Sequence, residues 1–108
     1  MLTKQELPEC PVASTVQLIG NKWKLLIIRN LLKGAQRFTE LKKGVPGISQ
    51  KVLTDNLRSL ESDGIVYREV FAEVPPKVIY SLTEIGQSLL PIINAMADWG
   101  ENYKSRIV

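Results

Sequence analysis

The chain has 108 residues, of which 44% are hydrophobic and 23% charged, which is typical of one ordinary globular domain spanning residues 1–108. It contains no histidine and a single cysteine, Cys10, which excludes an internal disulfide and a zinc site of the Cys/His type within one chain. The usual nucleophile–histidine catalytic arrangements are excluded for the same reason, and no glycine-rich phosphate loop is present. A lysine- or carboxylate-based enzyme stays open as an alternative, but no spacing of residues indicates one. We therefore expect no enzyme, no metal site and no cofactor.

The apolar segments are short. The longest uninterrupted aliphatic run, Leu25 to Ile28, is far too short to cross a bilayer. The first ten residues, MLTKQELPEC, have no apolar core of the kind that signal peptides carry. We expect a cytosolic protein without membrane contact. A chain of this size buries only a modest core, so its stability would gain from a partner subunit.

Positive charge is concentrated in one stretch of the chain. Between Lys22 and Arg58 there are nine basic and two acidic residues, a formal charge of +7, whereas the rest of the chain has five basic and nine acidic residues, or −4. Such a distribution is typical of a phosphate-binding face, although a solvated basic surface has the same composition. The structure predicted for this stretch favours the phosphate-binding interpretation.

Two helices are predicted in the first third of the chain, after a loose arm over residues 1–11. The first covers Val12–Ile19 and has an apolar face. The second covers Lys22–Lys33, with Asn21 as its N-cap and Gly34 as the residue that ends it. Because its apolar face is wide and includes Trp23, Ile27 and Ile28, we expect the second helix to lie in the middle of the fold.

The stretch Arg37–Ile65 predicts a helix-turn-helix. Thr39 can cap a short helix that ends at Lys43, and the following GVPGI sequence makes a turn. Ser49 can cap a longer helix that reaches about Asp63. Residues at helical spacing form one apolar stripe along this helix and are expected to be core. They are Val52, Leu53, Leu57 and Leu60.

After Gly64 the pattern changes to that of β-strands. Strands are predicted over Ile65–Phe71 and Val78–Leu82, and the prolines between them mark a turn because proline cannot donate to a ladder. A hairpin directly after a helix-turn-helix is the wing of a winged helix. Thr83 is expected to cap a last helix to about Arg106, kinked at Pro91. The predicted fold class is mainly α with a small β-hairpin (α+β), a winged helix-turn-helix.

The polar side of the Ser49–Asp63 helix carries the candidate DNA-reading residues. The major groove of B-DNA is about 12 Å wide and admits one helix, whose N-terminal residues usually touch base edges. Glutamine can pair with adenine, and lysine or arginine with guanine. We expect Gln50, Lys51 and Thr54 to read bases, and Arg58 to reach a base or a phosphate. The alternative is that they form the solvated side of an amphipathic helix.

A second set of residues is expected to bind the DNA backbone. Ser49 either caps its helix only or also donates to a phosphate at the helix N-terminus. The other candidates are Arg37, Lys42, Lys43, Arg68 and Lys77. The first three flank the short helix of the motif and supply phosphate attraction, which positions the protein without reading sequence. The last two lie on the hairpin, where they reach the backbone or minor groove or stay solvated.

Taken in order, several segments resemble the HxlR-type winged helix-turn-helix regulators, relatives of the MarR group. They are CPV, IGNKWKLLIIRNLLKG, RFTELKKGVPGISQKVLTDNLRSLESDGIVYR, VPPKVIYSLTEIGQSLLPII and the following WG. The resemblance spans nearly the whole chain. It implies a bacterial, cytosolic, dimeric DNA-binding transcription factor, with Ser49–Asp63 as recognition helix and Ile65–Leu82 as wing.

The resemblance also implies dimerisation through extra N-terminal and C-terminal helices, here Val12–Ile19 and Thr83–Tyr103. The implied interface residues are Val12, Val16, Ile19, Leu89, Ile92, Ile93, Met96, Trp99 and Tyr103. Cys10 lies where the family commonly has an N-terminal cysteine, which in some members senses quinones, aldehydes or oxidants. A sensing role requires an exposed thiolate, and an inert terminal thiol is the alternative.

The predicted function is a homodimeric transcriptional regulator that binds double-stranded DNA at a pseudo-palindromic operator, with redox or electrophile control through Cys10 as a further hypothesis. The main alternative is a winged helix used for protein–protein contact, whose basic face binds an acidic partner. Gating by a small-molecule effector of unknown identity also stays open. An apolar pocket between the dimer helices would look like core in a sequence.

Overall fold

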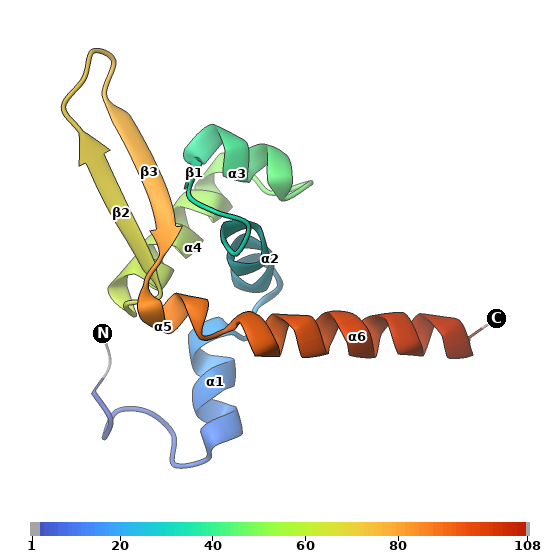
Figure 1. Ribbon diagram of the computed structural model, residues 1–108. Coiled ribbons are helices and arrows are strands. Elements are labelled where there is room, and N and C mark those ends of the chain that lie inside the picture. The colour runs from blue at the N-terminus through green and yellow to red at the C-terminus, as the bar shows by residue number, and fades with distance from the viewer. Residues whose placement is uncertain (1–2, 108) are drawn as a thin grey trace.

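The computed structural model describes residues 3–107, so the first two residues of the predicted N-terminal arm lie outside the described residues. Two helices come first, α1 (Pro11–Ile19) and α2 (Lys22–Leu31) (Figure 1). The predicted cap of α2 is confirmed, because Asn21 Oδ1 accepts a hydrogen bond from the Lys24 N–H at 2.8 Å. The helix ends two residues before the predicted Lys33.

The helix-turn-helix consists of α3 (Phe38–Gly44) and α4 (Gln50–Ser62). Ser49 caps α4 as predicted, with its Oγ accepting from the Val52 N–H at 3.1 Å. The prediction that Thr39 caps α3 is wrong, since the helix begins at Phe38 and Arg37 is the N-cap residue. The carboxylate of Glu40, in the first turn of α3, instead accepts a hydrogen bond from the Arg37 N–H at 2.8 Å. This contact satisfies a free backbone N–H at the start of the helix and places a negative charge at its N-terminus.

The sheet has three antiparallel strands, β1 (Gln36–Arg37), β2 (Val66–Phe71) and β3 (Lys77–Leu82), in the order β1-β3-β2. The predicted hairpin is confirmed as β2 and β3. The strand β1 was not predicted, because two residues are too short to show an alternating pattern. In the hairpin Arg68 lies opposite Tyr80, and these two residues share the face of the sheet that turns toward α4.

The C-terminal part differs from the prediction of one kinked helix. It forms a short helix α5 (Glu84–Gln87) and a separate long helix α6 (Leu90–Arg106). Thr83 caps α5, as its Oγ1 accepts from the Gly86 N–H at 3.1 Å. Pro91 lies in the first turn of α6, where a missing N–H is harmless, so the chain breaks before it rather than bending around it. Figure 1 shows α6 projecting away from the body of the molecule.

The core lies where α2 and α4 pack together against the base of the wing. It includes most of the predicted stripe of α4, while Val52 and Trp23 are only partly buried. Ile19, predicted for the dimer contact, is 4% exposed and belongs to this core. That part of the prediction is wrong, because its side chain is already used within the protomer. The predicted fold class, a winged helix-turn-helix of α+β type, is confirmed.

Asn30 ties α2 to the turn that precedes α4. It is the one buried polar side chain among residues 3–107. Its Nδ2 donates to the carbonyl oxygens of Leu26 at 2.9 Å and Gly44 at 3.0 Å. Because Gly44 ends α3, this contact fixes the turn of the helix-turn-helix against the core and so helps to set the direction of α4.

No helix in the described range 3–107 is long and apolar enough to span a membrane.

Candidate nucleic-acid interface

The N-terminal half of α4 is exposed along the side opposite its buried leucines. Gln50, Lys51 and Arg58 are exposed and Thr54 is half-buried. Leu53, Leu57 and Leu60 hold the other side in the core, so the helix cannot rotate to hide these polar groups. The base-reading candidates are therefore presented together at the surface.

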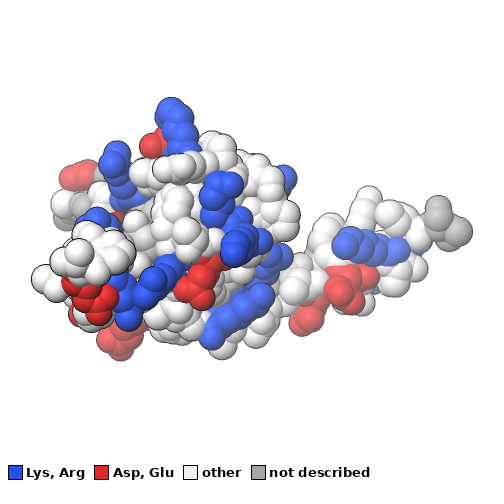
Figure 2. Space-filling model, turned by 90° about the horizontal axis from the view of Figure 1, so that it is seen from above, with Lys and Arg blue, Asp and Glu red and all other residues white. Residues whose placement is uncertain are grey.

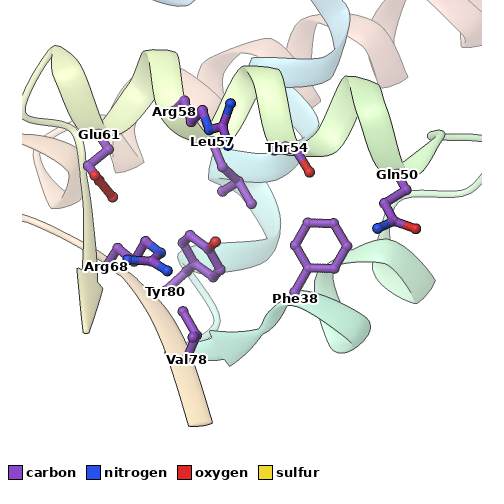
Figure 3. A pocket seen from close by; sticks show the side chains of 9 residues that line it. All are labelled: Phe38, Gln50, Thr54, Leu57, Arg58, Glu61, Arg68, Val78 and Tyr80. Atoms are coloured by element: carbon purple, nitrogen blue, oxygen red, sulfur yellow. The ribbon is translucent and has the colours of Figure 1, made fainter. Parts of the chain in front are cut away.

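A groove of about 560 Å³ lies between α4 and the inner face of the wing (Figure 3). Three predicted DNA-binding residues of α4, Gln50, Thr54 and Arg58, line one wall. Arg68 of β2 lines the opposite wall. The structure thus brings together residues from the helix-turn-helix and from the wing around one hollow whose polar groups reach solvent.

Lys51 does not line this groove but forms an ion pair on the exposed side of α4. Its Nζ lies 2.8 Å from Asp55 Oδ2, one helical turn away. The hydrogen bond from Lys51, followed by its charge, lowers the pKa of Asp55 below the ordinary carboxyl value. The same contact raises the pKa of Lys51. Both groups are therefore charged at neutral pH, and a phosphate or base edge must compete with Asp55 for the ammonium group.

The basic residues around α3 lie on the surface. Arg37 precedes the helix, Lys42 and Lys43 lie in its last turn, and all three are exposed. Figure 2 views the molecule from the side of α3 and the wing tip, where Lys and Arg outnumber Asp and Glu over the body. Arg37, Lys42 and Lys43, which belong to the basic stretch 22–58, are thus accessible to solvent.

Lys77, by contrast, lies apart from the groove. It starts β3 on the opposite sheet face from Arg68, and its Nζ lies 5.2 Å from the centre of the Phe71 ring. A cation held over an aromatic ring at the outer side of the wing does not join the cluster formed by Arg58 and Arg68. The two hairpin candidates, which the sequence could not tell apart, therefore occupy different environments.

Five residues that line the groove between α4 and the wing were not predicted for the DNA interface. They are Phe38, Leu57, Glu61, Val78 and Tyr80. Val78 and Tyr80 alternate along β3 with outward-facing residues, a signal that the sequence does contain. Their position opposite α4 depends on the hairpin register and on the angle between wing and helix, which involve residues distant in the chain.

An apolar surface extends over α1, α5 and α6, away from the groove. Trp99 is 68% exposed and Val12 72%, and no residue of α6 is buried. Other large apolar residues exposed there are Val16, Ile85, Leu90, Ile92, Met96 and Tyr103. Leu89 and Ile93, also predicted for the dimer contact, are partly buried against the protomer's own core. The remaining predicted contact residues are available on the surface.

A smaller hollow of about 130 Å³ lies beside this apolar surface, where α1, α5 and the start of α6 meet the end of α4. Ile19, Leu89 and Ile92 are among its lining residues. The hypothesis of a small-molecule effector in a pocket near these helices stays a prediction.

Cys10 is the N-cap residue of α1 and is exposed. It precedes Val12, one of the exposed apolar residues of α1, by two positions in the sequence. Within residues 3–107 the structure has no group of three or more His, Cys, Asp or Glu side chains placed to hold a metal ion.

A winged helix-turn-helix that presents basic and polar side chains along its second helix defines a DNA-binding transcriptional regulator. The HxlR-like helix-turn-helix family matches residues 18–108. The chain belongs to this family, and the resemblance inferred from the sequence is confirmed.

Known relatives agree with this assignment. The uncharacterized HTH-type transcriptional regulator YdeP of Bacillus subtilis (strain 168) is 53% identical over 98 residues, which cover 91% of this chain and 77% of the relative. The solved structure of the redox regulator HypR in its oxidized form matches with a TM-score of 0.82 at 50% identity, over 86% of this chain and 96% of HypR. The reduced form of YodB from B. subtilis matches with a TM-score of 0.76 at 41% identity, over 89% and 95%.

Proposed function

We propose that this regulator binds a pseudo-palindromic operator as a homodimer, with α4 in the major groove and the wing toward the adjacent minor groove. The observation that carries the proposal is the exposed polar side of α4, which continues into the groove lined by Arg58 and Arg68. Gln50, Lys51 and Thr54 then contact base edges. Arg37, Lys42 and Lys43 attract phosphates on either side.

The homodimer is supported by the exposure of α6. A helix of 17 residues without a buried residue has little to hold it against its own protomer. Its exposed residues Ile92, Met96, Trp99 and Tyr103 fall on one face at helical spacing, as expected for a contact with a second copy. A two-fold axis would relate the two α4 helices, which must lie about 34 Å apart to enter successive major grooves.

The test is binding to the DNA upstream of the protein's own gene, located by footprinting and then measured with the isolated duplex. We expect protection of two half-sites one helical turn apart and an affinity that falls steeply with salt, because several phosphates lose their counterions. The control is a duplex of the same composition with a scrambled sequence. Equal affinity for both duplexes, or an affinity that salt does not change, would contradict the proposal.

The alternative of an acidic protein partner is addressed by the same experiment. A basic face that serves only such a partner would not discriminate between operator and scrambled DNA. The position of Gln50 and Thr54 at the start of an exposed helix favours DNA over an acidic protein. Their uncharged amide and hydroxyl groups can pair with base edges, whereas the carboxylates of an acidic partner would be bound better by cations. The proposal assigns no catalytic role to the chain.

Redox control through Cys10 is the second part of the proposal. It is supported by the exposed thiol at the start of α1 and by the likeness to HypR and YodB, the former named a redox regulator. Two Cys10 thiols, one from each protomer, would join in a disulfide while an oxidant such as diamide takes up two electrons and two protons. We expect diamide to change operator binding of the wild-type protein and to leave Cys10→Ser unchanged. An equal response of both proteins would contradict it.

A further inference from the structure

The groove between α4 and the wing contains a hydroxyl group that the proposed DNA contacts have not used. Tyr80 of β3 stands on the inner face of the wing, and Figure 3 shows its ring rising toward α4 between Arg68 and Phe38. The register places it directly opposite Arg68 on β2. Side chains in such cross-strand pairs have Cβ atoms about 5 Å apart, so hydroxyl and guanidinium can reach the same ligand.

The Tyr80 hydroxyl is available to a ligand. The Tyr80 hydroxyl forms no hydrogen bond with any residue in the range 3–107. Every buried side-chain polar atom in that range does have a partner, so a hydroxyl without one is not buried. The Tyr80 hydroxyl is therefore open to solvent in the groove. This contrasts with Asn21, Asn30 and Thr83, whose polar groups all bind within the fold. Only the ring of Tyr80 contributes to packing, as it lies partly buried against the core.

The surroundings of Tyr80 suit an anion. Arg58 and Arg68 line the groove, and neither forms an ion pair with another residue in the described part of the chain. Glu61 is the one carboxylate in the lining, so two guanidinium groups stand against a single negative charge. Arginine and hydroxyl donors are those that most often bind the phosphate oxygens of DNA.

The identity of the anion follows from the shape of the duplex. Neighbouring major and minor grooves of B-DNA are separated by one sugar-phosphate strand. If α4 lies in the major groove and the wing reaches the minor groove, that strand must pass between them. The groove lined by Gln50, Thr54, Arg58, Arg68 and Tyr80 is the space between these two elements.

We infer that Tyr80 is a positioning residue whose hydroxyl donates a hydrogen bond to a phosphate of this strand, beside Arg58 and Arg68. The inference rests on the proposed function and adds to it a contact that carries no charge. Loss of this hydrogen bond should weaken binding equally for all DNA sequences, whereas loss of a base contact weakens binding to the operator only. An arginine contact displaces a counterion from the phosphate, and the uncharged tyrosine contact does not.

The experiment compares Tyr80→Phe with Arg68→Gln in binding the operator and a scrambled duplex at several salt concentrations. Tyr80→Phe keeps the ring and should bind both duplexes about 3- to 10-fold more weakly, the effect of one lost hydrogen bond. Its slope of log affinity against log salt should equal that of the wild type. Arg68→Gln should reduce the slope by about one, as expected for one lost phosphate contact of a charged residue.

Tyr67→Phe is the matched control. Tyr67 is the neighbouring exposed tyrosine of the wing but lies on the outer face of β2, so its loss of a hydroxyl should leave binding unchanged. Phosphate ethylation interference gives a second measurement. Among the phosphates of the strand between the two grooves, one should reduce wild-type binding most strongly when it is ethylated. Ethylation of the same phosphate should reduce the binding of Tyr80→Phe by a smaller factor.

The outcomes separate this inference from the proposed function. Wild-type protein that fails to bind any duplex would overturn both. Wild-type protein that binds while Tyr80→Phe binds equally well would overturn only the role of Tyr80. A Tyr80→Phe defect confined to the operator would identify a base contact instead, and a changed salt slope would identify a displaced charge. Both of these results also overturn the inference.

Discussion

Lys51 and Asp55 form an ion pair along the exposed edge of α4, with 2.8 Å between Lys51 Nζ and Asp55 Oδ2. The pair connects one of the predicted DNA-reading residues to the single acidic residue in the first two turns of the helix. Both side chains are largely solvated, so the pair contributes little to stability. The pair instead affects where the Lys51 side chain lies. The contact with Asp55 directs the ammonium group along the surface of α4 rather than out toward a ligand.

Replacing Asp55 with asparagine should strengthen DNA binding. The substitution removes a negative charge from the side of α4 that is proposed to meet DNA, and it frees the Lys51 ammonium group. We expect it to raise the affinity for both duplexes about two- to fivefold. Fluorescence anisotropy on operator and scrambled duplexes measures both. Asp98→Asn on α6 makes the same charge change far from α4 and should have no such effect. Weaker binding of Asp55→Asn would mean that the carboxylate itself contacts DNA.

Two substitutions of Ser49 separate its capping role from a contact with phosphate. Ser49→Ala removes the oxygen that accepts from the Val52 N–H and should lower the free energy of unfolding by about 1 kcal/mol. Ser49→Asp keeps a capping oxygen and should leave stability nearly unchanged. Because it adds a negative charge at the end of α4 that is proposed to face DNA, it should weaken binding by about 1 kcal/mol, or roughly fivefold. Urea unfolding and anisotropy measure the two effects.

A Ser49→Asp protein with wild-type affinity would contradict the placement of this helix end against the DNA backbone.

Gly44→Ala should destabilise the fold although alanine is normally the better helix residue. An added Cβ would lie 2.5 Å from Asn30 Oδ1, inside the contact that ties α2 to the turn before α4. We expect a loss of about 1–3 kcal/mol in urea unfolding, typical of an overpacked site. Lys43→Ala, one residue earlier and exposed, should change stability by less than about 0.5 kcal/mol.

A double variant tests the cause of that loss. Asn30→Ser shortens the side chain that the new methyl group would meet. It should cost stability by itself, but combined with Gly44→Ala the total loss should be smaller than the sum of the two single losses. Strictly additive losses would show that the two sites do not interact in this way.

Met96→Glu should separate the proposed dimer into monomers. Met96 lies on the exposed apolar face of α6, and a carboxylate buried in a subunit contact costs at least about 3 kcal/mol, or roughly 100-fold in the dimer dissociation constant. Analytical ultracentrifugation measures the dissociation constant. Asn94→Glu lies on the opposite side of the same helix and should stay dimeric. Dissociation of both variants, or of neither, would place the contact elsewhere.

Several features were predictable because they depend on residues close together in the chain. The caps formed by Asn21, Ser49 and Thr83 each involve a donor three residues later, and all three are confirmed. The hairpin follows from alternation and from the prolines of its turn. The family could be inferred from a series of motifs in order. None of these inferences needs to know which distant segments meet.

Other features were missed because they depend on distant residues. The strand β1 forms only because Gln36 and Arg37 pair with the edge of β3. Ile19 looked like part of an exposed helix face, yet it completes the core. Tyr80 is about twenty residues away from the helix that it faces, so neither its alternation along the strand nor its residue type could assign it to the groove.

The sequence by itself determined the order of the main helices and the hairpin, the caps formed by Asn21, Ser49 and Thr83, and the concentration of positive charge between Lys22 and Arg58, because helix caps, periodicity and charge are local properties. Only the tertiary structure decided that Arg68 and Tyr80 face α4 while Lys77 lies on the other side of the wing. The reason is that strand register and the packing of the wing on α4 join residues far apart in sequence. Burial of the shared core, rather than any local preference, selects that one arrangement.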